Sequence, residues 1–197
     1  MNKNSFIKLY DEICEKDGAA KALLNAQRNR EHNVPGVYPY IAFQDEHDLW
    51  DLFQALFQKF KGKENVRFLD VGAGTGRIVD LARKYGFGKA VGVEFFEPYV
   101  IAGKEMHKLG ESDLLVEDAF NLKWDFLKDF NVIYTYMPIR DSRKMSQLHC
   151  HLVAEAGWKT IFVEMLPQYY PVAVYMGNKL GEALGRYHFS SFQHMDI

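Results

Sequence analysis

The residues with the clearest chemistry lie in a glycine-rich segment between positions 70 and 76. The segment reads DVGAGTG and stands between a run typical of a β-strand and a run with helical periodicity. Glycine adopts positive φ without strain and lets a ligand approach the backbone, while free N–H groups at the start of a helix favour an anion. The candidate ligand-binding residues are Asp70, Gly72, Ala73, Gly74, Thr75 and Gly76.

The spacing of these glycines separates the classes of ligand. A dinucleotide-binding turn has the pattern G-x-G-x-x-G, whereas this turn has G-x-G-x-G and places Arg77 where the third glycine would stand. The pattern therefore argues against NAD and FAD, and it also lacks the spacing of a phosphate-binding P-loop. A bare glycine-rich turn also connects strands to helices without any ligand, so that alternative stays open.

Two acidic residues follow the next two predicted strands. Glu94 ends the run AVGVE, where its carboxylate can accept hydrogen bonds from both hydroxyls of a ribose. Asp118 follows the run DLLVE. Each acid alone is also explained as a solvated strand-end residue or as the cap of a turn, because Asp is common after strands.

Taken in order, the glycine turn and the two acids resemble the class I S-adenosylmethionine-dependent methyltransferase family, over residues 66 to 165. The first motif of that family is an acidic residue followed by G-x-G-x-G, as in LDVGAGTG here. The resemblance implies S-adenosylmethionine as the cofactor, with its methionine carboxylate on the turn and its ribose on Glu94. It also implies that Asp118 accepts a hydrogen bond from the adenine amino group and that Phe95 packs on the adenine. The further cofactor-binding positions in this interpretation are Ala119, Phe120 and Tyr134.

The end of the fourth predicted strand is where we expect the methyl acceptor, since ligands in open α/β sheets bind beyond the strand ends. Tyr134 and Tyr136, in the sequence YTYMP, are the candidate catalytic residues there. Many amine methyltransferases of the family place Asn or Asp before Pro-Pro and an aromatic residue at this point. This chain has YMPI instead, which argues against a nucleobase as the acceptor.

The layout of GVE, EDAF and VIYTYMP is similar to that of seven-strand protein lysine methyltransferases. The resemblance implies a protein lysine as the acceptor, and a small metabolite is the other open choice. An aromatic pocket lowers the pKa of a lysine by desolvation and positions its charged form through cation–π contacts. Candidate walls are Tyr38, Tyr40, Tyr134 and Tyr136, although each is equally explained as a core tyrosine with a satisfied hydroxyl.

Two other functions stay open. An aminopropyl transferase shares this type of sheet, but it would need an acidic cluster near the fourth strand, which Asp129 and Asp141 match only weakly. A non-catalytic module that binds the cofactor within a complex would explain the unfamiliar fourth-strand motif. A metal centre is not expected, because His149, Cys150 and His151 are consecutive in a predicted helix and therefore point about 100° apart.

A sheet is needed to bring these residues together. Five β-type runs alternate with helical stretches, which requires parallel strands joined by crossover helices. The runs are 66–71, 90–94, 113–117, 131–136 and 160–165. The expected fold class is α/β, a doubly wound, mostly parallel, Rossmann-like sheet. An antiparallel C-terminal strand is expected in RYHFSSFQH.

Two units are expected along the chain. Residues 1–44 form an N-terminal helical appendage with an aromatic loop, and residues 45–197 form the S-adenosylmethionine-binding methyltransferase domain. The appendage is predicted as two short helices within 5–30, with a break at Asp17 and the glycine that follows it. The loop at 34–43 is either a lid over the reacting methyl group or an element that docks the appendage on the core. Its aromatic residues are Tyr38, Tyr40 and Phe43.

Composition bounds the function further. The 197 residues include 24 Lys and Arg against 26 Asp and Glu, a net charge of −2, so no bulk attraction to nucleic acid is expected. Cys14 and Cys150 lack metal or redox spacing, which fits a reducing compartment. No stretch reaches the about 18 consecutive apolar residues of a membrane span. We therefore expect a cytoplasmic protein that acts on a protein or small-molecule substrate.

Overall fold

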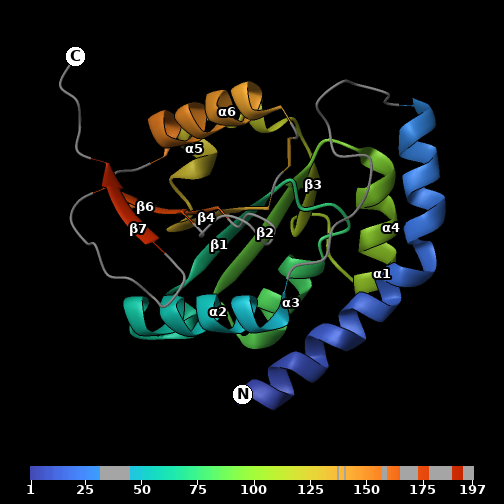
Figure 1. Ribbon diagram of the computed structural model, residues 1–197, viewed down its shortest axis with the longest axis horizontal. Coiled ribbons are helices and arrows are strands. Elements are labelled where there is room, and N and C mark those ends of the chain that lie inside the picture. Colours follow the sequence, from blue (N-terminus) through green and yellow to red (C-terminus); the bar gives the residue numbers. More distant parts are fainter. Residues whose placement is uncertain are drawn as a thin grey trace.

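The strands form one sheet whose order places the first strand near its middle. A computed structural model describes residues 1–31, 45–136, 138–139, 141–156, 159–164, 173–177 and 188–192. In this part of the chain a seven-stranded sheet has the order β3-β2-β1-β4-β5-β6-β7 (Figure 1). The strands are β1 (Arg67–Val71), β2 (Lys89–Glu94), β3 (Leu114–Val116), β4 (Val132–Thr135), β5 (Ile161–Glu164), β6 (Ala173–Gly177) and β7 (His188–Phe192).

Strands β1 to β5 are all parallel, and this confirms the predicted α/β class. Beyond them, β6 runs antiparallel to β5, and the final strand β7 pairs parallel with β6. The chain builds outward from β1 to β3 and then returns to place β4 on the other side of β1. The order therefore reverses between β1 and β4, and this is the point where open α/β sheets bind ligands.

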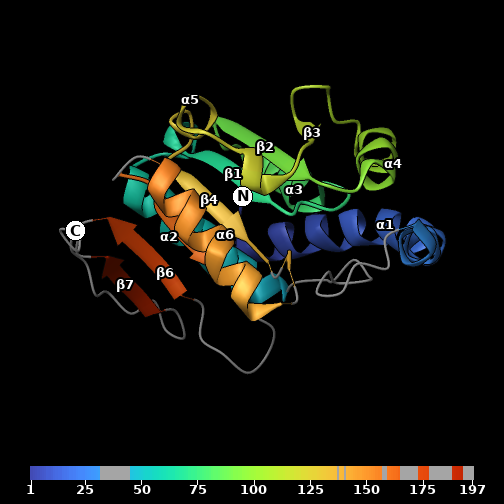
Figure 2. The ribbon, with the colours of Figure 1, turned by 90° about the horizontal axis from the view of Figure 1, so that it is seen from above.

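Helices cover both faces of the sheet, as expected for parallel strands. In Figure 1, α5 and α6 lie above the sheet and α2 and α3 lie below it, and Figure 2 shows α6 crossing the upper face. The helices are α1 (Lys3–Glu31), α2 (Glu46–Phe60), α3 (Arg77–Tyr85), α4 (Glu97–His107), α5 (Trp124–Leu127) and α6 (Ser142–Glu155), with short 3₁₀ turns η1 (Lys63–Asn65) and η2 (Ala119–Asn121). No helix in the described ranges combines the length and the apolar character needed to cross a bilayer.

Alternate residues of the central strands enter two separate cores. Phe68 and Tyr134 pack with α1, α2 and α3, whereas Leu69 and Ile133 pack with α6 on the other face. This follows from the two-residue period of a strand. Since both faces are apolar, the position of a residue in the strand decides which core it enters.

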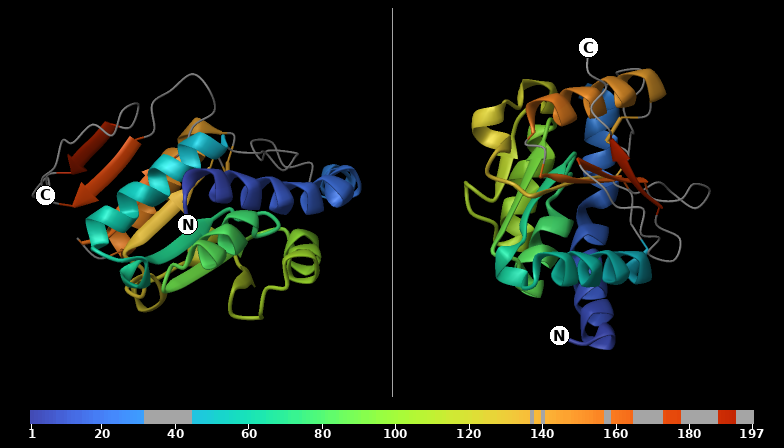
Figure 3. Two further views of the ribbon diagram at one scale, coloured as in Figure 1. Left: turned by 90° about the horizontal axis from the view of Figure 1, so that it is seen from below. Right: turned by 90° about the vertical axis from the view of Figure 1, so that its left-hand side faces the viewer.

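The N-terminal segment differs from its prediction. It is one helix, α1, and the predicted break at Asp17 is wrong. A glycine inside a helix costs about 1 kcal/mol relative to alanine, and burial of Phe6, Tyr10 and Ile13 in the main core outweighs that cost. Helix α1 contacts α2, α3 and α4, and Figure 3 shows it running along the side of the molecule. The domain boundary at residue 44 stays a prediction, and the loop at 34–43 lies outside the described residues.

Candidate functional site

The turn that follows β1 contains three glycines whose backbone φ lies in the left-handed region. Gly72, Gly74 and Gly76 have φ of 81°, 58° and 78°. The Gly72 and Ala73 amides both donate to the Val93 carbonyl oxygen, at 2.9 and 3.0 Å, so the turn is fastened to β2. An L-residue would be strained at each of these φ values, which explains the three glycines of the motif.

The glycines have different surroundings. A Cβ atom at Gly72 would overlap the ring of Pro138, and one at Gly76 would press against Leu109. At Gly74 a Cβ atom would meet no described atom within 4 Å. The backbone of the turn is therefore packed at its two ends and open at Gly74, the position at which a ligand can approach it.

Glu94 lies beside that open backbone. Its side chain is buried at the end of β2, where Oε2 accepts a hydrogen bond from the Gly74 amide at 2.9 Å and Oε1 accepts one from the Phe96 amide at 2.8 Å. The carboxylate thus joins the turn to the segment that starts α4. Glu94 is the last residue of β2, as the sequence predicted, and its role toward a ribose stays a prediction.

Apolar side chains gather at the same edge of the sheet. Phe95, Val116 and Phe120 are 51%, 47% and 37% exposed, which is high for side chains of this kind. Glu94 and Val116 are paired in the β2–β3 register, so these residues follow neighbouring strand ends. Asp118 is exposed there, and its side chain accepts a hydrogen bond from the Phe120 amide at 3.0 Å. Asp118 is thereby the N-cap of η2, which begins at Ala119. This edge offers flat apolar surface next to an acid.

Asp70 is a buried residue of β1, two positions before the first glycine of the turn. Burial raises its pKa to about 7, nearby Arg77 acts to lower it, and Glu94 acts to raise it. Asp70 is paired with Tyr134 in the β1–β4 register. The role of Asp70 toward a cofactor stays a prediction.

The two candidate catalytic tyrosines lie in different surroundings. Tyr134 has no exposed surface, and its ring centroid lies 5.5 Å from that of Phe68 in the main core. Burial raises its pKa well above its ordinary value, and Asp70 adds to the shift. Tyr136 follows β4 and is half-buried. The catalytic assignment of both stays a prediction, but only Tyr136 offers surface to a substrate.

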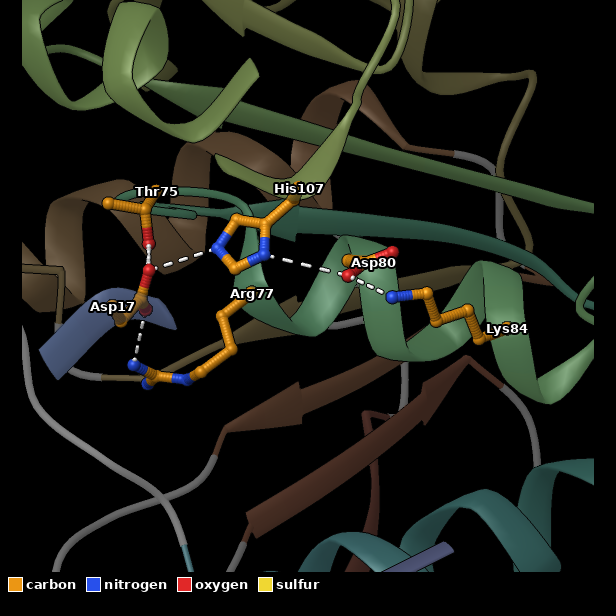
Figure 4. Close-up of polar contacts among 6 residues, drawn as sticks. All are labelled: Asp17, Thr75, Arg77, Asp80, Lys84 and His107. Atoms are coloured by element: carbon orange, nitrogen blue, oxygen red, sulfur yellow. Dashed lines mark hydrogen bonds and ion pairs between the residues drawn. The ribbon is translucent and has the colours of Figure 1, made fainter. Parts of the chain in front are cut away.

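A buried polar cluster on the other side of the turn was not foreseen from the sequence. Asp17 of α1 is 0% exposed and accepts hydrogen bonds from Thr75 Oγ1 at 2.8 and 2.9 Å, from Arg77 Nη1 at 3.0 Å and from His107 Nε2 at 2.9 Å (Figure 4). His107 Nδ1 lies 3.5 Å from Asp80 Oδ2. The Thr75 side chain therefore faces α1, and any contact of this residue with a cofactor would come through its backbone.

A sequence signal for this cluster exists in retrospect. Phe6, Tyr10 and Ile13 form the buried stripe of α1, and Asp17 continues that stripe four residues later. A charged residue in line with an apolar stripe must find partners, because an unpaired buried charge is costly. The partners themselves come from α3 and α4 and could not be read from α1.

The consecutive residues of α6 that suggested a metal centre diverge. His149 Nε2 lies 3.6 Å from Glu164 Oε1, whereas His151 Nε2 lies 2.8 Å from the Leu122 carbonyl oxygen. Cys150 is exposed. Within the described ranges no group of three or more His, Cys, Asp or Glu side chains could hold a metal ion.

A cavity of about 520 Å³ lies away from the turn, at the start of β2 and before β3. Lys89, Ser112, Asp113 and Phe126 contribute to its lining. None of the predicted site residues lines it. The amino ends of parallel strands are not the edge at which open α/β sheets bind ligands, so we base the site on the geometry of the turn.

Comparisons with known proteins bear on the fold. No family model matches the sequence, and no curated protein matches it. A plantazolicin methyltransferase, solved with a triazolic desmethylPZN analog and S-adenosylhomocysteine, has a TM-score of 0.50 and 14% sequence identity over 84% of this chain and 61% of that one. The chain has the class I methyltransferase fold.

Other methyltransferase structures are similar at lower scores. An RNA methyltransferase from Salinibacter ruber, with S-adenosylhomocysteine bound, has a TM-score of 0.48 at 19% identity over 66% of this chain and 83% of that one. An amino pentose methyltransferase from Micromonospora echinaspora, with S-adenosylmethionine bound, has a TM-score of 0.49 at 16% identity over 66% of this chain and 59% of that one. The chain thus spans about three fifths of the plantazolicin and amino pentose enzymes.

Proposed function

We propose that this protein is an S-adenosylmethionine-dependent methyltransferase. The observation that carries the proposal is the open backbone at Gly74, held by the Glu94 carboxylate at the reversal point of a methyltransferase fold. The methyltransferases of similar structure were solved with S-adenosylmethionine or S-adenosylhomocysteine. Their cofactor is the one that the resemblance of LDVGAGTG to the first motif of the family implies.

The residues present fit that cofactor. The open position at Gly74 gives a cradle that a side chain would fill, and the N-terminal end of α3, directly after the turn, suits the methionine carboxylate. Glu94 would hold the ribose hydroxyls, since carboxylates accept strong hydrogen bonds. The adenine would lie against Phe95 and Phe120, with Asp118 at its amino group; these two rings are exposed at the edge where they would be needed.

When bound, S-adenosylmethionine would supply the methyl group of its sulfonium to a nucleophile on the acceptor, and S-adenosylhomocysteine would leave. The tasks left to the protein are to orient the acceptor, exclude water and keep the acceptor deprotonated. Tyr136 is the described aromatic residue that is best placed for contact with an acceptor, because it follows β4 at the reversal point and is half-buried. We propose N-methylation of a protein lysine or a small metabolite.

The acids that would suit an aminopropyl transferase do not form a cluster. Asp129 precedes β4 and pairs with Arg67 and Lys89, so it lies at the edge opposite the glycine turn. Asp141 accepts a hydrogen bond from the Lys144 amide at 2.9 Å and begins α6. A polyamine would meet no paired acids there, and this favours the methyltransferase.

Binding to purified protein tests the cofactor. We expect S-adenosylmethionine and S-adenosylhomocysteine to bind with dissociation constants on the order of micromolar, and NAD and ATP not to bind, because the turn has neither dinucleotide nor P-loop spacing. Calorimetry with the four compounds checks this, and a preference for NAD or ATP would overturn the cofactor assignment. Transfer of a labelled methyl group to fractions of a lysate then separates an enzyme from a binding module.

A further inference from the structure

The buried polar cluster joins three helices to the glycine turn. It is formed by Asp17 of α1, Thr75 of the turn, Arg77 and Asp80 of α3, and His107 of α4. At the solvent-facing end of the cluster, Lys84 forms an ion pair with Asp80, with Nζ 2.7 Å from Asp80 Oδ2. Figure 4 shows Asp17 entering from α1 between Thr75, Arg77 and His107.

Asp17 is the centre of this cluster. Its two carboxylate oxygens accept hydrogen bonds from three residues, and its side chain has no exposed surface. Burial acts to raise the pKa of Asp17, but the His107 hydrogen bond and the Arg77 charge outweigh burial and lower it. An ionised carboxylate at 0% exposure is tolerated only with such partners. Asp17 is therefore the polar contact that fixes α1 to the turn, beside the apolar packing of Phe6, Tyr10 and Ile13.

Thr75 is held from two sides. Its hydroxyl is bound by Asp17, and its backbone is so close to α4 that a Cβ atom at Gly103 would overlap the Thr75 carbonyl group. Gly74, the open position, immediately precedes it. Glu94 binds the Gly74 amide, and the next residue, Thr75, is held by α1 on one side and by α4 on the other.

We propose that Asp17 is a positioning residue of the cofactor site. By holding Thr75 and Arg77, it keeps the glycine turn in the conformation that leaves Gly74 open, so docking of α1 and binding of the cofactor are coupled. The identity of the ligand rests on the proposed function. Because coupling is reciprocal, the cofactor must also strengthen the docking of α1.

The central variant is Asp17→Asn, which keeps the shape of the side chain and removes its charge. The matched control is Ile13→Val, which weakens the apolar packing of the same helix and leaves every polar group of the cluster in place. We expect Asp17→Asn to weaken S-adenosylhomocysteine binding about tenfold, within the usual range of coupling between sites. The Ile13→Val control is expected to stay within about twofold of the parent.

A second measurement needs no ligand. Hydrogen exchange of the turn amides at 72–76 in the unliganded protein should be faster in Asp17→Asn than in the parent, and unchanged in Ile13→Val. Equal exchange in the parent and Asp17→Asn overturns the positioning role, whatever ligand the turn binds. If the parent binds no S-adenosylhomocysteine but exchange still rises in Asp17→Asn, the proposed function fails and the positioning role stands.

Thr75→Val keeps the test decisive if Asp17→Asn does not fold. It removes the hydroxyl that Asp17 binds and leaves Asp17 paired with Arg77 and His107. Faster exchange at 72–76 in this variant supports the proposal. Parental exchange rates would overturn it, because the contact through which Asp17 acts would then have no effect.

Discussion

Gly74 and Thr75 are neighbours in the sequence, yet they face opposite environments. Gly74 turns its backbone to open space beside Glu94, whereas the Thr75 hydroxyl is buried against Asp17 of α1. The open side has no side chain at the critical position, and the closed side is held by charged, buried groups. The comparison shows how a loop of small residues is kept in one conformation: one side is packed and paired, so the other can be left free for a ligand.

The largest expected effect is on the open side. Gly74→Ala places a methyl group in the open space at φ 58°, which costs about 1 kcal/mol of folding stability and blocks the approach of a ligand. We expect S-adenosylhomocysteine to bind about 100-fold more weakly, measured by calorimetry. Gly86→Ala is the matched control, since Gly86 also has positive φ but caps α3 away from the turn. Equal binding by the two variants would show that Gly74 does not face the ligand.

Glu94→Ala tests the acid that borders the open side. Loss of hydrogen bonds to a charged acceptor is expected to weaken binding by about 1.5–3 kcal/mol, or roughly 10- to 150-fold. Titration calorimetry of the folded variant measures this change. Glu97→Ala removes an exposed acid three residues away and serves as the control. A folded Glu94→Ala protein with parental affinity would remove Glu94 from the site and leave it only as support for the turn.

The closed side should respond to pH through His107. Burial acts to lower its pKa, but hydrogen bonds and charge from Asp17 and Asp80 outweigh burial and raise it. Arg77 and Lys84 are the other charged groups of the cluster. Because the folded-state pKa lies above the unfolded value, this stabilisation is complete below about pH 6.5 and is lost as the pH rises through the folded-state pKa.

The expected effect is small and is best measured by thermal unfolding between pH 7 and 9. Below about pH 7 the raised pKa of Asp70 also contributes to the pH dependence. We expect the Tm of the parent to fall by about 2–4 °C more than that of His107→Gln over this interval. His47→Gln, at an exposed position, should behave as the parent. Parallel curves for the parent and His107→Gln would show that protonation of His107 does not stabilise the closed side.

The sequence by itself determined the open side. The pattern G-x-G-x-G can be read because positive φ is a local requirement, and all three of its glycines have positive φ. The five parallel strands were predicted from local runs and lie within one or two residues of their expected bounds. Glu94 and Asp118 could be placed at the same edge of the sheet as the turn, because the carboxyl ends of parallel strands share one edge.

Only the tertiary structure decided the closed side and the two cores. In the structure Tyr134 of β4 lies in the main core with Phe68. The sequence could not show this, because a strand that is apolar on both faces has no polar–apolar alternation to tell which residues face which core. The continuity of α1 came from packing that outweighed a local helix-breaking signal. Asp17 and Thr75 are 58 residues apart, and no local propensity relates two residues at that distance. Their contact exists because α1 docks against α3 and α4, where a buried charge must find its partners.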